Sequence, residues 1–388
     1  MKAKVLGIIT ATLITLSALS APFLSNPAVA ATSYTVTFNA NGGSGTMAKQ
    51  VVPVRGKTLA TNKFTRDSYR FIGWSLTSTG PVKYHRTTVV KPKKNMTVFA
   101  QWKTTLDTPA LLGHKLGKLL WSDSFTGSAD GLIDSTNWTS RYCGHESANG
   151  GGTCHNSEKQ WYTPDAIRLD GTPQGNAVIT TKRVTTAPTN AGSCLSPPCN
   201  YTSGRFDTQN KVSFKYGYIE TRMKMPAGGA NWPAFWALGD AMTQVGWPLA
   251  GEIDIAEQGG NLPMRNSAAV HFSKTNTATC CGNHAYVWGE EKNQANYQTD
   301  FHTYGLAWLP NRLEFYIDRE VFWTVTPANV QGQWVFNEPF FLILNNAVGG
   351  NVGFGGSYTG WAESKTIIDY VHAWELNGQG SVVKRLGR

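Results

Sequence analysis

Short runs rich in hydrophobic residues, some of them alternating with polar positions, recur along most of the chain. The clearest runs are 177–182, 216–225, 252–257, 268–272, 313–318, 340–344 and 366–374. They are rich in β-branched and aromatic residues, Gly, Asn and Pro separate them, and no stretch beyond about ten residues keeps a helical period. Because many short strands at close intervals with turn residues between them are typical of all-β domains, residues 116–377 are predicted to form an all-β sandwich or barrel.

A second pattern precedes this domain. Short aromatic strands are expected at 34–38, 71–74 and 98–102, with a turn cluster at 39–43. Residues 31–103 are therefore predicted to be a separate small module. We interpret residues 104–115 as a linker and residues 378–388 as a tail.

The first 30 residues have the pattern of a secretory signal. Lys2 and Lys4 precede the apolar run Val5–Leu19, and Ala28-Val29-Ala30 fits a cleavage site. A membrane anchor is the alternative, but the run is shorter than the ~20 apolar residues that a span needs. We expect a secreted protein, extracellular or associated with the cell wall and not membrane-spanning.

Charge is distributed unevenly. The chain of 388 residues has a formal charge of +10, which by itself would suggest a nucleic-acid or membrane-surface partner. Residues 31–103 contain twelve Lys and Arg against one acid, whereas residues 104–388 contain 21 against 24 acids. The excess thus belongs to the small module, and two parts with different partners are expected, neither of them nucleic acid.

The six cysteines, at 143, 154, 194, 199, 280 and 281, suggest disulfides in an exported protein. The pairs Cys143–Cys154 and Cys194–Cys199 would close small loops and are preferred. Cys280 and Cys281 would then form a vicinal bridge or stay reduced. A zinc site using Cys143, His145, Cys154 and His155 has non-standard spacing and is disfavoured.

Three acids occur in the run Glu252-Ile253-Asp254-Ile255-Ala256-Glu257. In a regular strand Glu252 and Asp254 would share one face, and Glu257 would fall among the isoleucines, where an unpaired carboxylate is costly. A one-residue β-bulge near Ile255–Ala256 would bring all three acids to one surface. Paired carboxylates suit glycoside hydrolysis, one as nucleophile and one as general acid. An exposed acidic strand or a calcium site would show the same string.

Tryptophans near the acids favour a sugar site. Trp232 and Trp236 stand in a Gly- and Pro-rich run shortly before the acids, and Gly246-Trp247-Pro248 follows. Aromatic faces can stack on the apolar faces of sugar rings. Most other tryptophans are expected in the core.

Several motifs together resemble glycoside hydrolase family 16, particularly its laminarinase group. They are 216–222, Trp232-Pro233-Ala234-Phe235-Trp236, 246–248, 251–257, Val270-His271, 301–304 and 339–345. The resemblance implies a curved antiparallel β-jelly-roll sandwich with an open cleft and a retaining mechanism. It also implies that Glu252 is the nucleophile, Asp254 the assisting acid and Glu257 the general acid/base. The sugar-binding residues that it implies are Trp232, Trp236, His271, Arg205 and Asn345.

The sequence departs from this family in two places. Relatives often begin Asp-Glu-Phe, where this chain has Asp123-Ser124-Phe125, so a structural calcium ion with Asp369 as a ligand is left in doubt. The segment 273–291, with Cys280, Cys281 and Trp288, is unusual and is expected to border the leaving-group side. No organic cofactor motif is present.

These features predict an endo-β-1,3-glucanase that acts on laminarin-type β-glucan. The alternatives are a mixed-linkage β-1,3-1,4-glucanase, another β-glycan endohydrolase or a non-catalytic glucan-binding protein. The small module resembles internalin-B-type repeats, β-grasp-like modules of bacterial surface proteins, through 34–43, Gly73-Trp74 and 99–102. Its unusual basic residues, Lys83, Arg86, Lys91, Lys93 and Lys94, suggest an anionic cell-wall polymer as partner; the alternative is a spacer with a solvated basic face.

Overall fold

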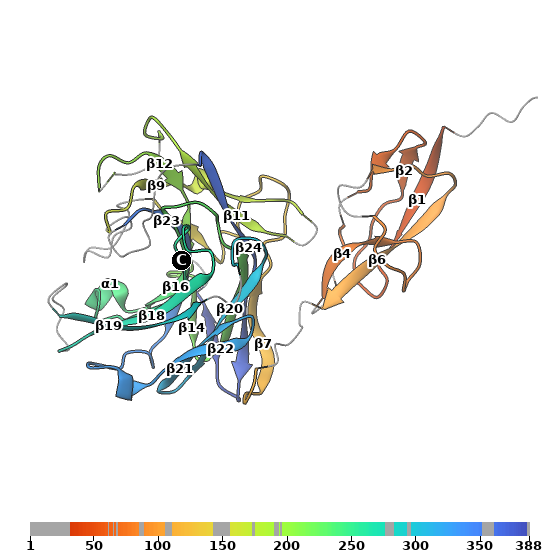
Figure 1. Ribbon diagram of the computed structural model, residues 1–388. Coiled ribbons are helices and arrows are strands. Elements are labelled where there is room, and N and C mark those ends of the chain that lie inside the picture. The colour runs from red at the N-terminus through yellow and green to blue at the C-terminus, as the bar shows by residue number, and fades with distance from the viewer. Residues whose placement is uncertain are drawn as a thin grey trace, which may run out of the picture.

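The computed structural model describes residues 32–60, 62–64, 66, 69–84, 89–104, 111–142, 156–172, 175–189, 194, 196–275, 283–292, 296–350 and 361–385 (Figure 1). The predicted signal and four of the cysteines, at 143, 154, 280 and 281, lie outside these residues. Cys194 and Cys199 form the predicted local disulfide.

The N-terminal module is a small mixed β-sheet with its own core. Its strands are β1 (Ser33–Asn39), β2 (Gln50–Pro53), β4 (Tyr69–Ser75) and β6 (Met96–Thr104), in the order β2-β1-β6-β4, and β3 (Lys57–Thr58) pairs with β5 (Val89–Val90). The central strands β1 and β6 run parallel. Val36, Val52, Trp74 and Val98 fill the core beneath this sheet. The three strands predicted from the sequence are thus confirmed.

The rest of the chain forms two β-sheets. The back sheet has the order β22-β21-β20-β15-β24-β11-β12-β9, with β7 on β24 and β10 on β11. Its strands are β7 (Leu116–Asp123), β9 (Gln160–Tyr162), β10 (Ile167–Leu169), β11 (Ala177–Arg183), β12 (Tyr201–Ser203), β15 (Gly217–Lys224), β20 (His302–Leu309), β21 (Arg312–Ile317), β22 (Glu320–Val325) and β24 (Glu363–Leu376).

The second sheet, here called the site sheet, has the order β19-β18-β17-β16-β23-β13-β8, with β14 beside β23 and β25 beside β14. Its strands are β8 (Thr139–Ser140), β13 (Arg205–Asp207), β14 (Val212–Lys215), β16 (Asn231–Gly239), β17 (Glu252–Glu257), β18 (Arg265–Ser273), β19 (His284–Lys292), β23 (Phe340–Val348) and β25 (Ser381–Lys384). The helical turns are α1 (Met242–Val245), η1 (Pro164–Ala166) and η2 (Pro327–Asn329).

A single hydrophobic core lies between the two sheets. Phe235 and Ile253 of the site sheet and Ile219 and Val371 of the back sheet belong to it, and each is at most 1% exposed. Burying such a side chain contributes about 1.5–3 kcal/mol. Because strands alternate, neighbouring residues of the site sheet face away from this core, on what we call its outer face. The all-β sandwich predicted from the sequence is therefore confirmed.

The structure changes both predicted ends of this domain. Leu111, placed in the linker by the sequence, is 5% exposed and packs with Tyr218 and Trp374. The predicted tail contributes β25, in which Val212 pairs with Lys384, and Val382 packs against the main core. Apolar contact at one end and strand pairing at the other extend the sandwich to Leu111 and Lys384. No helix among the described residues is long and apolar enough to cross a bilayer.

Candidate active site

The three acids of β17 lie on the outer face because the strand contains a bulge. Phe235 of β16 pairs with Ala256 and Trp236 with Asp254, so Ile255 is an extra residue. The pairing with β18 shifts over the same stretch. Ile253, Ile255 and Ala256 are in the core. The β-bulge predicted from the odd spacing of the acids is therefore confirmed, and it lets Glu257 share a face with Glu252 and Asp254.

Each carboxylate has a specific partner. The indole Nε1–H of Trp247 donates to Glu252 Oε2 at 2.6 Å, and that of Trp232 donates to Glu257 Oε1 at 2.8 Å. His271 Nε2 lies 3.0 Å from Asp254 Oδ2. Donors at fixed positions hold the carboxylates in defined orientations, as a site for directed chemistry requires.

Burial and mutual repulsion raise the pKa values of two of the acids. Burial, together with the charge of Glu252, raises the pKa of Asp254 to about 7. Burial, together with the charge of Asp254, raises the pKa of Glu257 to about 8, although the Trp232 hydrogen bond opposes this. Closely spaced carboxylates cannot all ionise. At neutral pH, Glu257 therefore carries a proton that it can donate.

His271 is held between two partners. Burial opposes its protonation, but the charges of Glu252 and Asp254 prevail and raise its pKa to about 9. Its Nδ1 lies 2.7 Å from Nε2 of His284, whose own pKa is lowered to about 4 by burial and by the charge of His271. A charged His271 thus forms an ion pair with Asp254 through Nε2 and donates Nδ1–H to a neutral His284. His284 fixes the ring that in turn faces the acids.

Trp236, Asn345 and Arg205 form a connected group beside the acids. Trp236 Nε1 donates to Asn345 Oδ1 at 2.7 Å, and the Arg205 guanidinium lies 4.9 Å from the centre of a Trp236 ring. Arg205 and Asn345 are directly paired across β13 and β23. Asn345 Nδ2 also donates to the Tyr162 hydroxyl at 3.0 Å. All three residues that the sequence suggested here therefore come together.

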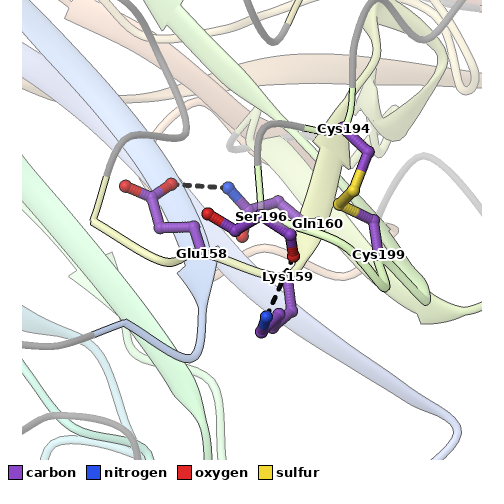
Figure 2. The surroundings of a disulfide bond; sticks show 6 residues. All are labelled: Glu158, Lys159, Gln160, Cys194, Ser196 and Cys199. Carbon is purple, nitrogen blue, oxygen red and sulfur yellow. Dashed lines mark hydrogen bonds between the residues drawn. A yellow bond between two sulfur atoms is a disulfide. The ribbon is translucent and has the colours of Figure 1, made fainter.

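A buried carboxylate just before β9 supports this group. Gln160 Nε2 donates to Glu158 Oε2 at 2.6 Å, and the Tyr162 hydroxyl lies 3.4 Å from the same oxygen. Figure 2 shows this segment next to the Cys194–Cys199 disulfide, where Lys159 donates to the Ser196 carbonyl oxygen. Burial raises the pKa of Glu158 above its usual value, although its hydrogen bonds and the charge of Arg205 oppose this rise. The disulfide loop and β9 thus brace the Asn345 side of the site.

Residues 158–371, over half of the chain, match the family described as "Glycosyl hydrolases family 16". The chain belongs to this family.

Relatives of this family 16 chain include curated enzymes and solved structures. A "Glucan endo-1,3-beta-glucosidase" of Cryptopygus antarcticus is 31% identical, and the match covers 68% of this chain and 94% of the relative. The "Glucan endo-1,3-beta-glucosidase A1" of Niallia circulans is 31% identical over 69% of this chain, but the match spans only 39% of that enzyme. The laminarinase catalytic domain of Thermotoga maritima superposes with a TM-score of 0.57 at 30% identity, covering 67% of this chain and 99% of that one. The predicted jelly-roll sandwich is the fold of these laminarinases.

The N-terminal module has a separate match. Residues 34–101 match the Listeria-Bacteroides repeat domain. The predicted repeat module is confirmed at the level of this domain family, and the narrower internalin-B type stays a prediction.

The structure offers little support for calcium at Asp369. Arg222 Nη1 lies 2.7 Å from Asp369 Oδ2, so a guanidinium already neutralises a carboxylate that is 2% exposed. This arrangement does not fit a calcium ligand, and no step below depends on calcium. Among the described residues, the one cluster with metal-ligand geometry is Glu252, Asp254 and His271, whose contacts are those already given.

Sequence reasoning did not identify four residues of this family 16 site as functional: Trp247, His284, Glu158 and Tyr162. Trp247 stood in a quoted motif next to the acids, and that proximity was a usable signal. His284 lies on β19, and its ring centre is 4.4 Å from that of Trp247. Glu158 and Tyr162 reach the site through contacts between residues far apart in sequence, which no local motif marks.

Proposed function

We propose that this family 16 chain is an endo-β-1,3-glucanase that hydrolyses laminarin-type glucan with retention of configuration. The observation that carries the proposal is the bulged strand, on which Glu252 and a protonated Glu257 share one face. The names of the relatives from Cryptopygus antarcticus and Niallia circulans and of the Thermotoga maritima structure support the β-1,3 linkage.

In the proposed mechanism, Glu252 attacks the anomeric carbon while Glu257 donates its proton to the departing glycosidic oxygen. This breaks the glycosidic bond and forms a covalent glycosyl ester with Glu252. Glu257, now ionised, deprotonates a water molecule that attacks the same carbon and releases the sugar. Asp254, which forms an ion pair with His271, assists because its protonation state determines the negative charge beside Glu252.

Product analysis tests the substrate. The enzyme is expected to release reducing ends from laminarin much faster than from lichenan or galactan. Comparable or higher rates on lichenan would point to a mixed-linkage glucanase, and no hydrolysis of any glucan would point to a binding protein.

The alkaline limit of activity should depend on Trp232. A general acid works while protonated, so activity falls as pH rises through its pKa, which for Glu257 is about 8. The Trp232 N–H stabilises the ionised carboxylate. Trp232→Phe removes this hydrogen bond, should raise the pKa further, and should move the alkaline limb of kcat/KM on laminarin to higher pH. Trp236→Phe is the control, because Trp236 donates to Asn345; a limb that shifts to lower pH in Trp232→Phe would contradict this account.

We also propose that the protein is exported and that the N-terminal module holds it on anionic wall polymer. Lys83, Lys91, Lys93 and Lys94 are all exposed, and the module has a core of its own. Deleting residues 31–103 should leave kcat/KM on soluble laminarin unchanged and should abolish the salt-sensitive part of retention on isolated cell walls. Loss of most soluble activity would contradict separate roles for the two parts.

A further inference from the structure

Two large aromatic side chains are exposed on β19, the edge strand of the site sheet. Tyr286 is 55% and Trp288 50% exposed. Their neighbours Ala285 and Val287 pack against the main core. Because side chains alternate along a strand, Tyr286 and Trp288 lie on the outer face, the same face as the acids.

Strand register places these rings in line with the carboxylates. Across β17, β18 and β19, Asp254 pairs with Ala269 and Ala269 with Trp288. In the adjacent row Glu252 pairs with His271, and His271 with Tyr286. Two strand spacings separate Trp288 from Asp254, a distance of about 10 Å. The side chain between them is only the methyl group of Ala269, so no bulky side chain of β18 separates Asp254 from Trp288 in this row.

The two rings are held in place. The planes of Tyr286 and His284 are 14° apart, with ring centres 5.6 Å from each other. The Arg265 guanidinium lies 6.0 Å from the centre of a Trp288 ring, and its Nε is 2.5 Å from Glu290 Oε2. On the opposite face of the strand, the Trp323 ring lies so close to Gly289 that a Cβ there would be 2.3 Å from it. The platform therefore rests on an aromatic support.

We propose that Tyr286 and Trp288 form an aromatic platform that binds the glucan chain beyond the pair of sugars at the bond being cleaved. The proposal rests on the proposed function and adds a binding site that discriminates by chain length. Flat aromatic faces suit the C–H faces of pyranose rings, and the Arg265 guanidinium beside Trp288 can donate to sugar hydroxyls. The occupant is a neutral glucan chain, because the platform continues the outer face that carries the acids.

The test is the ratio of kcat/KM for a long laminari-oligosaccharide to that for laminaritriose, measured on the full chain. Trp288→Ala should lower this ratio about 3- to 10-fold, the value of one aromatic contact. Tyr286→Ala should lower it similarly and serves as the second variant if Trp288→Ala fails to fold. Trp288→Phe, which keeps a ring, should stay within about twofold of wild type. Val321→Ala is the matched control, since Val321 is 52% exposed on β22, outside the site.

The possible failures are distinguishable. If wild-type protein hydrolyses laminarin but neither alanine variant changes the ratio, the platform is wrong and the proposed function stands. If wild-type protein hydrolyses neither substrate, the proposed function fails as well. The other possible occupant of the platform is a second copy of this chain, which sedimentation of wild type and Trp288→Ala tests. A wild-type dimer that dissociates in the variant, with the kcat/KM ratio unchanged, would make these rings a dimer interface and overturn the proposal.

Discussion

Replacing Glu252 with glutamine is expected to lower kcat on laminarin roughly 10,000-fold or more, because the neutral amide cannot form the glycosyl ester. Glutamine has the same shape, and its carbonyl oxygen can still accept the Trp247 N–H, which donates to Glu252 at 2.6 Å. Glucan binding should therefore persist. The substitution also removes the negative charge of Glu252, which raises the pKa of Asp254, so the pKa of Asp254 should fall.

Two measurements check this expectation. Reducing-end release gives kcat, and calorimetric titration with a laminari-oligosaccharide gives Kd, which should stay close to the wild-type value. Glu320→Gln, at an exposed acid on β22, is the matched control and should behave as wild type. A Glu252→Gln enzyme with activity within tenfold of wild type would exclude Glu252 as the nucleophile.

Replacing Glu257 with alanine should lower kcat on laminarin about 100- to 10,000-fold, the usual contribution of a general acid/base. The loss should depend on the leaving group. A dinitrophenolate departs without a proton, so the first step on a dinitrophenyl β-glucoside of a laminari-oligosaccharide should remain fast and give a burst. The second step, hydrolysis of the glycosyl ester, should become slow because the variant has no base to activate water.

Azide distinguishes this role from general damage to the site. A small anionic nucleophile needs no base, so azide should accelerate turnover of the dinitrophenyl glycoside by Glu257→Ala and give a β-glycosyl azide. Glu252→Ala should instead give an α-azide or no reaction. Absence of both the burst and the rescue in Glu257→Ala would contradict the acid/base assignment.

The sequence predicted the carboxylate strand in detail because local physics constrains it. An odd spacing between Asp254 and Glu257, with isoleucine between them, leaves either a buried unpaired acid or a bulge, and the structure has the bulge. Strands marked by short runs of apolar residues, such as 340–344, could be predicted equally well. The expectation that most other tryptophans lie in the core also holds for Trp308, which is 1% exposed.

Other parts of the site depend on tertiary contacts that no local pattern encodes. Tyr162 and Asn345 are 183 positions apart and meet only when β9 and β23 are in place. His284 acts through His271, on the neighbouring strand. The ends of the domain were predicted too narrowly for a similar reason. Leu111 and Val382 pack against strands that are distant in sequence, so the local pattern around them is that of a linker and a tail.

The central claim is that Glu252 and Glu257 together cleave β-1,3-glucan by double displacement. Proton NMR of wild-type enzyme with laminarin, recorded within the first minutes before mutarotation, reads the anomeric configuration of the newly formed reducing ends. The account predicts that the β-anomer appears first and the α-anomer grows in only as mutarotation proceeds. An α-anomer as the first product would contradict it.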